Sequence, residues 1–174
     1  MGWSSWNCFG GSQSQLKMTT IADAIVKTGL RDLGYVNLAL DGGWTSFQHG
    51  GAPAKGSVGP HGWNFKNLSD YYHANGLKLG MYVTGGFEAV YQHEAEWAEV
   101  MFGEWGADGI KVDHMCQGAS CGTGAQGHMI AVEFQQATIE RWVSAIAAVN
   151  KTDSVLFQVR MGPPRACTLM LSAF

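Results

Sequence analysis

The sequence predicts an α/β fold with parallel strands, because short apolar runs alternate along the chain with stretches of helical periodicity. Two further observations support this prediction. Several apolar runs end at a polar or aromatic residue, and glycine-rich segments follow two of them. In a (β/α)8 (TIM) barrel and in a doubly wound sheet alike, functional residues gather at the carboxyl ends of the strands. The periodicity leaves these two architectures open.

About five strand–helix units follow in order. We expect strands at residues 1–6, 35–41, 77–83, 109–112 and 154–159, and helices at residues 19–33, 68–75, 94–105 and 129–149. The first helix is expected to end at Gly34, because glycine is common after a helix C-terminus. The glycine-rich stretch 42–64 is too long for a plain connection, so we interpret it as a functional loop, and residues 114–127 form a second glycine-rich loop.

Composition excludes some functions. The 174 residues suffice for one domain, and no composition break suggests a second. A net charge of -3 without a lysine or arginine cluster argues against a nucleic-acid partner. No run of about 18 apolar residues predicts a membrane span. The chain begins without a visible signal peptide, so its location stays unknown. Cys116 and Cys121 could close a small disulfide loop or remain free thiols.

Four candidate site residues stand at or just past strand ends, namely Trp6, Asp41, Tyr82 and Asp113. Lys111 lies two positions before Asp113, so strand periodicity places both side chains on one face. A neighbouring lysine favours an ionised carboxylate, which a nucleophile requires. A structural ion pair explains the same pattern equally well. Asp41 could likewise cap a turn or accept a hydrogen bond from a substrate hydroxyl.

A metal site is a third interpretation. His114 follows Asp113 directly and could bind a metal together with Asp41, although a solvated loop histidine fits the pattern better. No GxGxxG directly joins an expected strand to a helix and no GxSxG stands at a strand-to-helix elbow, and neither GxxxxGK[ST] nor HExxH occurs. The sequence therefore predicts neither a metal nor an organic cofactor.

Four segments resemble, in the same order, motifs of the α-galactosidase (melibiase) family, glycoside hydrolase family 27. Residues 1–7 (MGWSSWN) resemble its opening motif, and residues 40–44 (LDGGW) its Asp-Asp-x-Trp strand ending. Residues 75–82 (NGLKLGMY) and 105–113 (WGADGIKVD) are similar to its Lys-Gly-Leu-Lys-Leu-Gly-Ile-Tyr and Trp-Gly-x-Asp-x-x-Lys-x-Asp runs. Together the four segments identify residues 1–160 as a partial catalytic barrel.

The resemblance implies a (β/α)8 barrel, truncated here to about five strand–helix units, that cleaves terminal α-galactosides with retention. It implies that Asp113 is the nucleophile and that Trp6, Asp41, Tyr82 and Lys111 contact the sugar. It implies no metal or cofactor, and a secreted or lysosome-like location.

The chain also departs from the family pattern. Gly42 replaces the second carboxylate of the Asp-Asp pair, and no segment matches the acid/base. Residues 161–174 form an atypical tail, in which we expect that the coding frame ends abnormally. An inactive relative that binds sugar is thus the alternative function, and the open barrel edges could support self-association.

Overall fold

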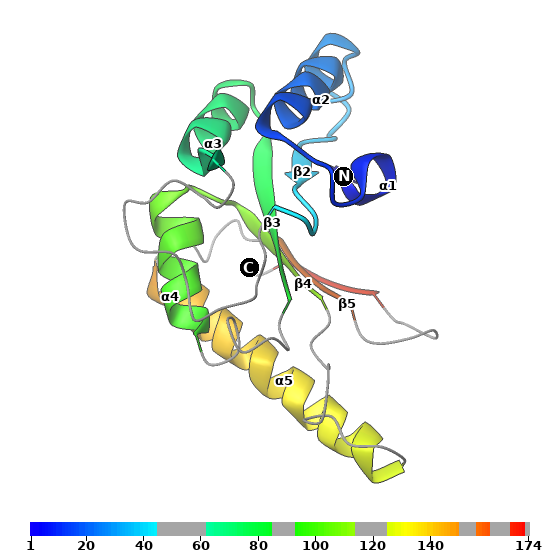
Figure 1. Ribbon diagram of the computed structural model, residues 1–174, viewed down its shortest axis with the longest axis vertical. Coiled ribbons are helices and arrows are strands. Elements are labelled where there is room, and N and C mark those ends of the chain that lie inside the picture. Colours follow the sequence, from blue (N-terminus) through cyan, green and yellow to red (C-terminus); the bar gives the residue numbers. More distant parts are fainter. Residues whose placement is uncertain (45–61, 85–92, 114–124, 150–155, 161–167, 173–174) are drawn as a thin grey trace.

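A six-stranded sheet organises the chain, with strand order β1-β2-β3-β4-β5-β6 (Figure 1). The computed structural model describes residues 1–44, 62–84, 93–113, 125–149, 156–160 and 168–172. Strands β1 to β5 run parallel, and β6 pairs antiparallel with β5. The strands are β1 (Gly2–Ser4), β2 (Asn37–Ala39), β3 (Lys78–Thr84), β4 (Gly109–Asp113), β5 (Leu156–Arg160) and β6 (Thr168–Ser172).

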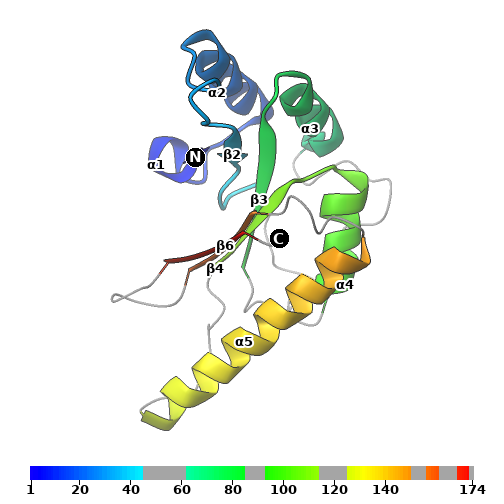
Figure 2. The same ribbon diagram turned by 180° about the vertical axis from the view of Figure 1, so that it is seen from behind.

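Helices connect the strands and pack in two neighbouring pairs. They are α1 (Trp6–Phe9), α2 (Gln15–Lys27), α3 (Phe65–Ala74), α4 (Glu94–Ala98) with its π-helical continuation η2 (Glu99–Glu104), and α5 (Ala125–Ala148). In both views α2 lies beside α3, and α4 lies beside α5 (Figures 1 and 2). None of the helices in the described ranges is long and apolar enough to cross a bilayer.

Local sequence explains where two of these helices begin and end. Ser14 caps α2 by accepting a hydrogen bond from the Lys17 amide, and Asn64 caps α3 by accepting one from the Asn67 amide. The predicted first helix, at residues 19–33, is wrong at both ends, because α2 begins at Gln15 and ends at Lys27. Gly29 takes a left-handed φ of 78° directly after the Thr28 cap, which breaks the helix before the remaining turns.

The core lies on one face of the sheet, which we call the outer face. The strand residues on this face alternate with those of the opposite face and are at most 2% exposed; they are Leu38, Leu79, Met81, Val83, Ile110 and Val112. Helix α3 packs over β3 and contributes Phe65, Leu68 and Tyr72. Burial raises the pKa of the Tyr72 hydroxyl, which donates a hydrogen bond to the Met18 carbonyl of α2.

The opposite, inner face of the sheet carries small and polar residues. In register across the strands, Ala39 pairs with Gly80, Gly80 with Gly109, and Tyr82 with Lys111. In a closed barrel this face lines the interior, and its carboxyl-terminal end forms the mouth.

Two features differ from the sequence predictions. Trp6 does not belong to the first strand, because β1 ends at Ser4 and Trp6 begins α1. Within the expected tail, β6 covers the edge of β5, so that edge is not open as expected. At the other side, β1 pairs only with β2 among the described strands.

Candidate active site

Asp41 stands two residues beyond β2 and is almost completely buried, with 4% of its surface exposed. One carboxylate oxygen, Oδ1, accepts a hydrogen bond from the Gly42 amide at 2.8 Å. The other, Oδ2, accepts from the Ser4 hydroxyl at 3.1 Å and from Lys111 Nζ at 2.8 Å. All three donors hold the carboxylate in one orientation in a poorly solvated position. Asp41 is therefore arranged as a fixed acceptor.

Lys111 joins the two carboxylates of the site. It lies in β4 with 16% of its side chain exposed, and its Nζ is 2.8 Å from Asp41 Oδ2 and 3.6 Å from Asp113 Oδ2. The same ammonium stands 5.2 Å from the centre of the Tyr82 ring. One cation thus compensates two buried anions, and this shared charge holds the segment after β2 against β4.

Asp113 and Tyr82 reach the site from the ends of adjacent strands. Asp113 closes β4 and is 6% exposed, whereas Tyr82 lies in β3 beside Lys111 and is 7% exposed. The Tyr82 carbonyl accepts a hydrogen bond from the buried Trp44 indole at 3.0 Å. This bond ties the strand end to an aromatic cluster in which Trp44 packs edge-on against Phe65.

Trp6 completes the set from the first helix and is 53% exposed. The surroundings of Gly42 show that Trp6 lies close to Tyr82. A Cβ atom on Gly42 would lie 3.6 Å from Trp6 Cζ3 and 3.3 Å from Tyr82 Cε1. The two rings thus border the same glycine. A larger side chain at this position would contact both rings, so Gly42 shapes the space between them.

All five sequence-predicted site residues lie in one cluster at the carboxyl end of the sheet. Sequence reasoning missed Ser4, which shares its strand face with the site by alternation and could have been found from that signal. It also missed Ser5, whose hydroxyl accepts a hydrogen bond from the Asp41 amide at 2.9 Å, and Gln13, whose side-chain Nε2 donates one to the Asp41 carbonyl. Ser5 lies within the motif at residues 1–7, whereas no local pattern marks Gln13.

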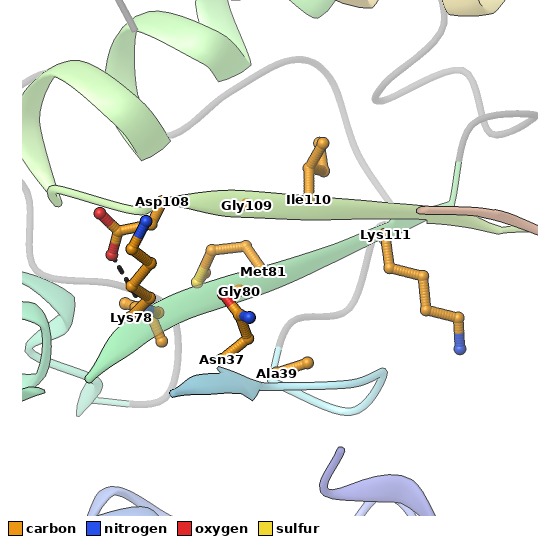
Figure 3. Close-up of a pocket in the computed structure, with 10 residues that line it drawn as sticks. Asn37, Ala39, Lys78, Gly80, Met81, Asp108, Gly109, Ile110 and Lys111 are labelled. Carbon is orange, nitrogen blue, oxygen red and sulfur yellow. Dashed lines mark hydrogen bonds between the residues drawn. The ribbon is translucent and has the colours of Figure 1, made fainter. Parts of the chain in front are cut away.

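A shallow pocket continues from Lys111 along the sheet (Figure 3). Ala39, Gly80 and Gly109 form its small-residue floor, and Lys78 lies at its far end. Figure 3 shows Ile110 and Lys111 on opposite sides of β4, as strand alternation requires.

The metal interpretation involves His114, which lies outside the described residues. Within those that are described, no group of three or more His, Cys, Asp or Glu side chains could hold a metal ion. Cys8 is a free, exposed thiol, whereas Cys116 and Cys121 lie outside the described part of the chain.

The fold and this cluster place the chain in a structural class, that of a partial (β/α) barrel with charged and aromatic side chains at the ends of its strands. A family model described as alpha galactosidase A (Melibiase_2) matches residues 1–142. The chain belongs to this family, which is a family of glycosidases.

Individual relatives agree with this assignment. The α-galactosidase 3 of Arabidopsis thaliana is 36% identical over 124 residues, which are 66% of this chain and 28% of that protein. The α-galactosidase of Lachancea cidri is 31% identical over 164 residues, which are 90% of this chain and 32% of that protein. A solved α-galactosidase from Saccharomyces cerevisiae superposes with a TM-score of 0.71 and 25% identity, covering 91% of this chain and 34% of its own. The chain spans about a third of the length of these relatives.

Proposed function

We propose that this chain carries the nucleophile and the sugar-binding residues of an α-galactosidase site. In this proposal, Asp113 attacks the anomeric carbon of a terminal α-galactoside and forms a covalent glycosyl ester, so that the overall reaction retains configuration. The observation that carries the proposal is Lys111, whose ammonium lies 2.8 Å from Asp41 and 3.6 Å from Asp113 at the mouth of the sheet.

Asp41 and Lys111 suit sugar hydroxyl groups because they present a fixed acceptor and a charged donor side by side. Tyr82 and Trp6 present aromatic rings next to Gly42. Flat rings of this kind pack against the apolar face of a pyranose. The proposed sugar position is therefore polar on the side of the carboxylates and apolar on the side of the rings.

This proposal assigns a nucleophile but no proton donor. A retaining glycosidase needs a second carboxyl group about 5–5.5 Å from the nucleophile. Asp41 is unsuited to this role, because Ser4, Gly42 and Lys111 all donate hydrogen bonds to its carboxylate. No segment of the sequence matches the family's acid/base motif. Reactivity should therefore depend strongly on the leaving group.

A nitrophenyl α-galactoside tests the proposal, because its leaving group departs without protonation. As the bond from Asp113 to C1 forms, the C1–O bond breaks and its electron pair leaves with nitrophenolate. We expect up to one equivalent of nitrophenolate per chain and a galactosyl adduct on the Asp113 peptide in mass spectrometry.

Asp113→Asn should abolish both signals. Asp70→Asn is the matched control, since Asp70 lies on α3, with 56% of its side chain exposed, and pairs with Lys66. Equal release by wild type and Asp113→Asn would refute the assignment of the nucleophile.

The second candidate function is sugar binding without turnover, which is favoured because no proton donor is assigned among the described residues. In that case no nitrophenolate appears, but calorimetry still detects galactose binding. Lys111→Met should weaken that binding, because it removes the cation that joins Asp41 and Asp113. Absence of both release and binding would refute both functions.

We also propose that the chain self-associates through the unpaired edge of β1, which pairs only with β2 among the described strands. Light scattering coupled to size-exclusion chromatography tests this proposal. A monomer at every concentration would refute it.

A further inference from the structure

We infer that Gln13 is a positioning residue for this site, because its carboxamide fixes the main chain that carries Asp41. The inference rests on the proposed function, since it concerns how the sugar acceptor is held. Gln13 lies just before α2, in a segment to which neither the family motifs nor the strand pattern assigns a role.

The contacts of Gln13 form a closed network with Ser5, Asp41 and Gly42. Its Nε2 group donates to the Asp41 carbonyl at 2.5 Å and to the Gly42 carbonyl. Its Oε1 atom accepts a hydrogen bond from the Ser5 hydroxyl. That hydroxyl in turn accepts one from the Asp41 amide at 2.9 Å. The network therefore holds the main chain of Asp41 on both its amide and its carbonyl side.

The peptide group between Asp41 and Gly42 transmits this constraint to the carboxylate. The Asp41 carbonyl and the Gly42 amide belong to one planar unit and cannot rotate independently. Gln13 holds the carbonyl end, and the amide end donates to Asp41 Oδ1 at 2.8 Å. Fixing this plane thus fixes the carboxylate oxygen opposite the one that binds Lys111.

The chemistry of this position calls for a carboxamide. Two carbonyl oxygens face the side chain and can only accept, so two N–H donors are required. The Ser5 hydroxyl accepts from the Asp41 amide and therefore offers its own proton to an acceptor. Glutamine supplies both functions from one planar group. Glutamate keeps the shape but loses the donors, and leucine loses all three bonds.

The two segments also approach each other closely through their backbones. Gly43 has a φ of 102°, and a Cβ there would come within 2.5 Å of the Gly11 Cα. This contact keeps the segment that carries Gln13 next to the loop that it holds. The Gln13 side chain can therefore reach the main chain of Asp41 directly, because the two backbone segments are in contact.

The test compares the variants Gln13→Leu and Gln13→Glu with wild type by amide hydrogen exchange in NMR. We expect the Asp41 and Gly42 amides to exchange about tenfold faster in both variants, relative to the amide of Met81 in the core. We also expect the dissociation constant for free galactose to rise about tenfold, as lost hydrogen bonds of ordinary strength would produce. Unchanged exchange at both amides would overturn the inference.

Gln15→Leu is the matched control. Gln15 is a half-buried glutamine two residues further on, and it accepts a hydrogen bond from the Asn64 amide at 3.0 Å. It should lose stability but keep wild-type exchange at Asp41 and Gly42 and wild-type galactose affinity. Equal effects of the Gln13 and Gln15 variants would reduce Gln13 to a structural role. If wild type does not bind galactose, the proposed function fails, and amide exchange alone decides about Gln13.

Discussion

The two faces of the sheet use alternate residues of the same strands for different purposes. In β3 and β4, the outer-face residues Leu79, Met81, Ile110 and Val112 are at most 2% exposed and pack beneath helices. The inner-face residues between them include Gly80, Tyr82, Gly109 and Lys111. Hydrophobic burial therefore stabilises one face, while the other holds the charges. Because successive side chains in a strand point to opposite faces, residues that stabilise the fold alternate with residues that form the site.

The comparison explains why a charged cluster is tolerated in so short a chain. Asp41, Lys111 and Asp113 are largely buried, and removing such groups from water is costly. Their mutual contacts, together with the hydrogen bonds to Asp41, offset part of this cost. The apolar outer face supplies the remaining stability, so its residues should be more sensitive to truncation than the polar residues at the rim of the inner face.

The largest expected effect is on the outer face. Met81→Ala should lower the free energy of unfolding by about 2–5 kcal/mol, because it leaves a cavity in a site with no solvent access. Urea titration followed by circular dichroism measures the change. Lys78→Ala, at a partly buried position on the inner face of the same strand, should cost only about 1 kcal/mol. Equal losses in the two variants would contradict the separation of the faces.

A smaller but substantial effect is expected at Gly43, outside both faces. Gly43→Ala should cost about 1–3 kcal/mol, because a side chain there needs an unfavourable left-handed φ and would also meet the Gly11 Cα at 2.5 Å. Gly29→Ala has a similar φ of 78° with no atom within 4 Å of the added Cβ, so it isolates the conformational cost. Thermal unfolding measures the loss of stability in each variant. An equal loss in Gly29→Ala and Gly43→Ala would show that the contact with Gly11 adds nothing to the conformational cost.

The smallest change in stability is expected for Trp6→Ala, at about 1 kcal/mol or less, because the ring is 53% exposed. Its galactose affinity should nevertheless fall at least about tenfold, which is roughly the loss of one aromatic contact. Leu16→Ala is the control, since Leu16 is 76% exposed on α2 and apart from the proposed sugar position. Unchanged affinity in Trp6→Ala, measured by calorimetry, would remove Trp6 from the site.

Much of the fold could be predicted from the alternation of strands and helices. The existence of the five parallel strands and the carboxyl-end position of Tyr82 and Asp113 follow from local periodicity, whereas the spatial order of the strands does not. Helix ends were less predictable. The caps Ser14 and Asn64 lie just outside the apolar pattern, which is why α2 and α3 both begin earlier than expected. The antiparallel β6 was not predicted, because a short apolar segment does not specify the direction of its pairing.

The sequence by itself determined which residue types stand at the strand ends, since Asp41, Lys111 and Asp113 are recognisable from their positions along the chain. Only the tertiary structure decided that one ammonium joins both carboxylates, because that contact spans 70 residues between β2 and β4. It also decided that Gln13 holds the loop of Asp41. Side-chain hydrogen bonds between distant segments depend on how the backbone is packed, and no local periodicity encodes them.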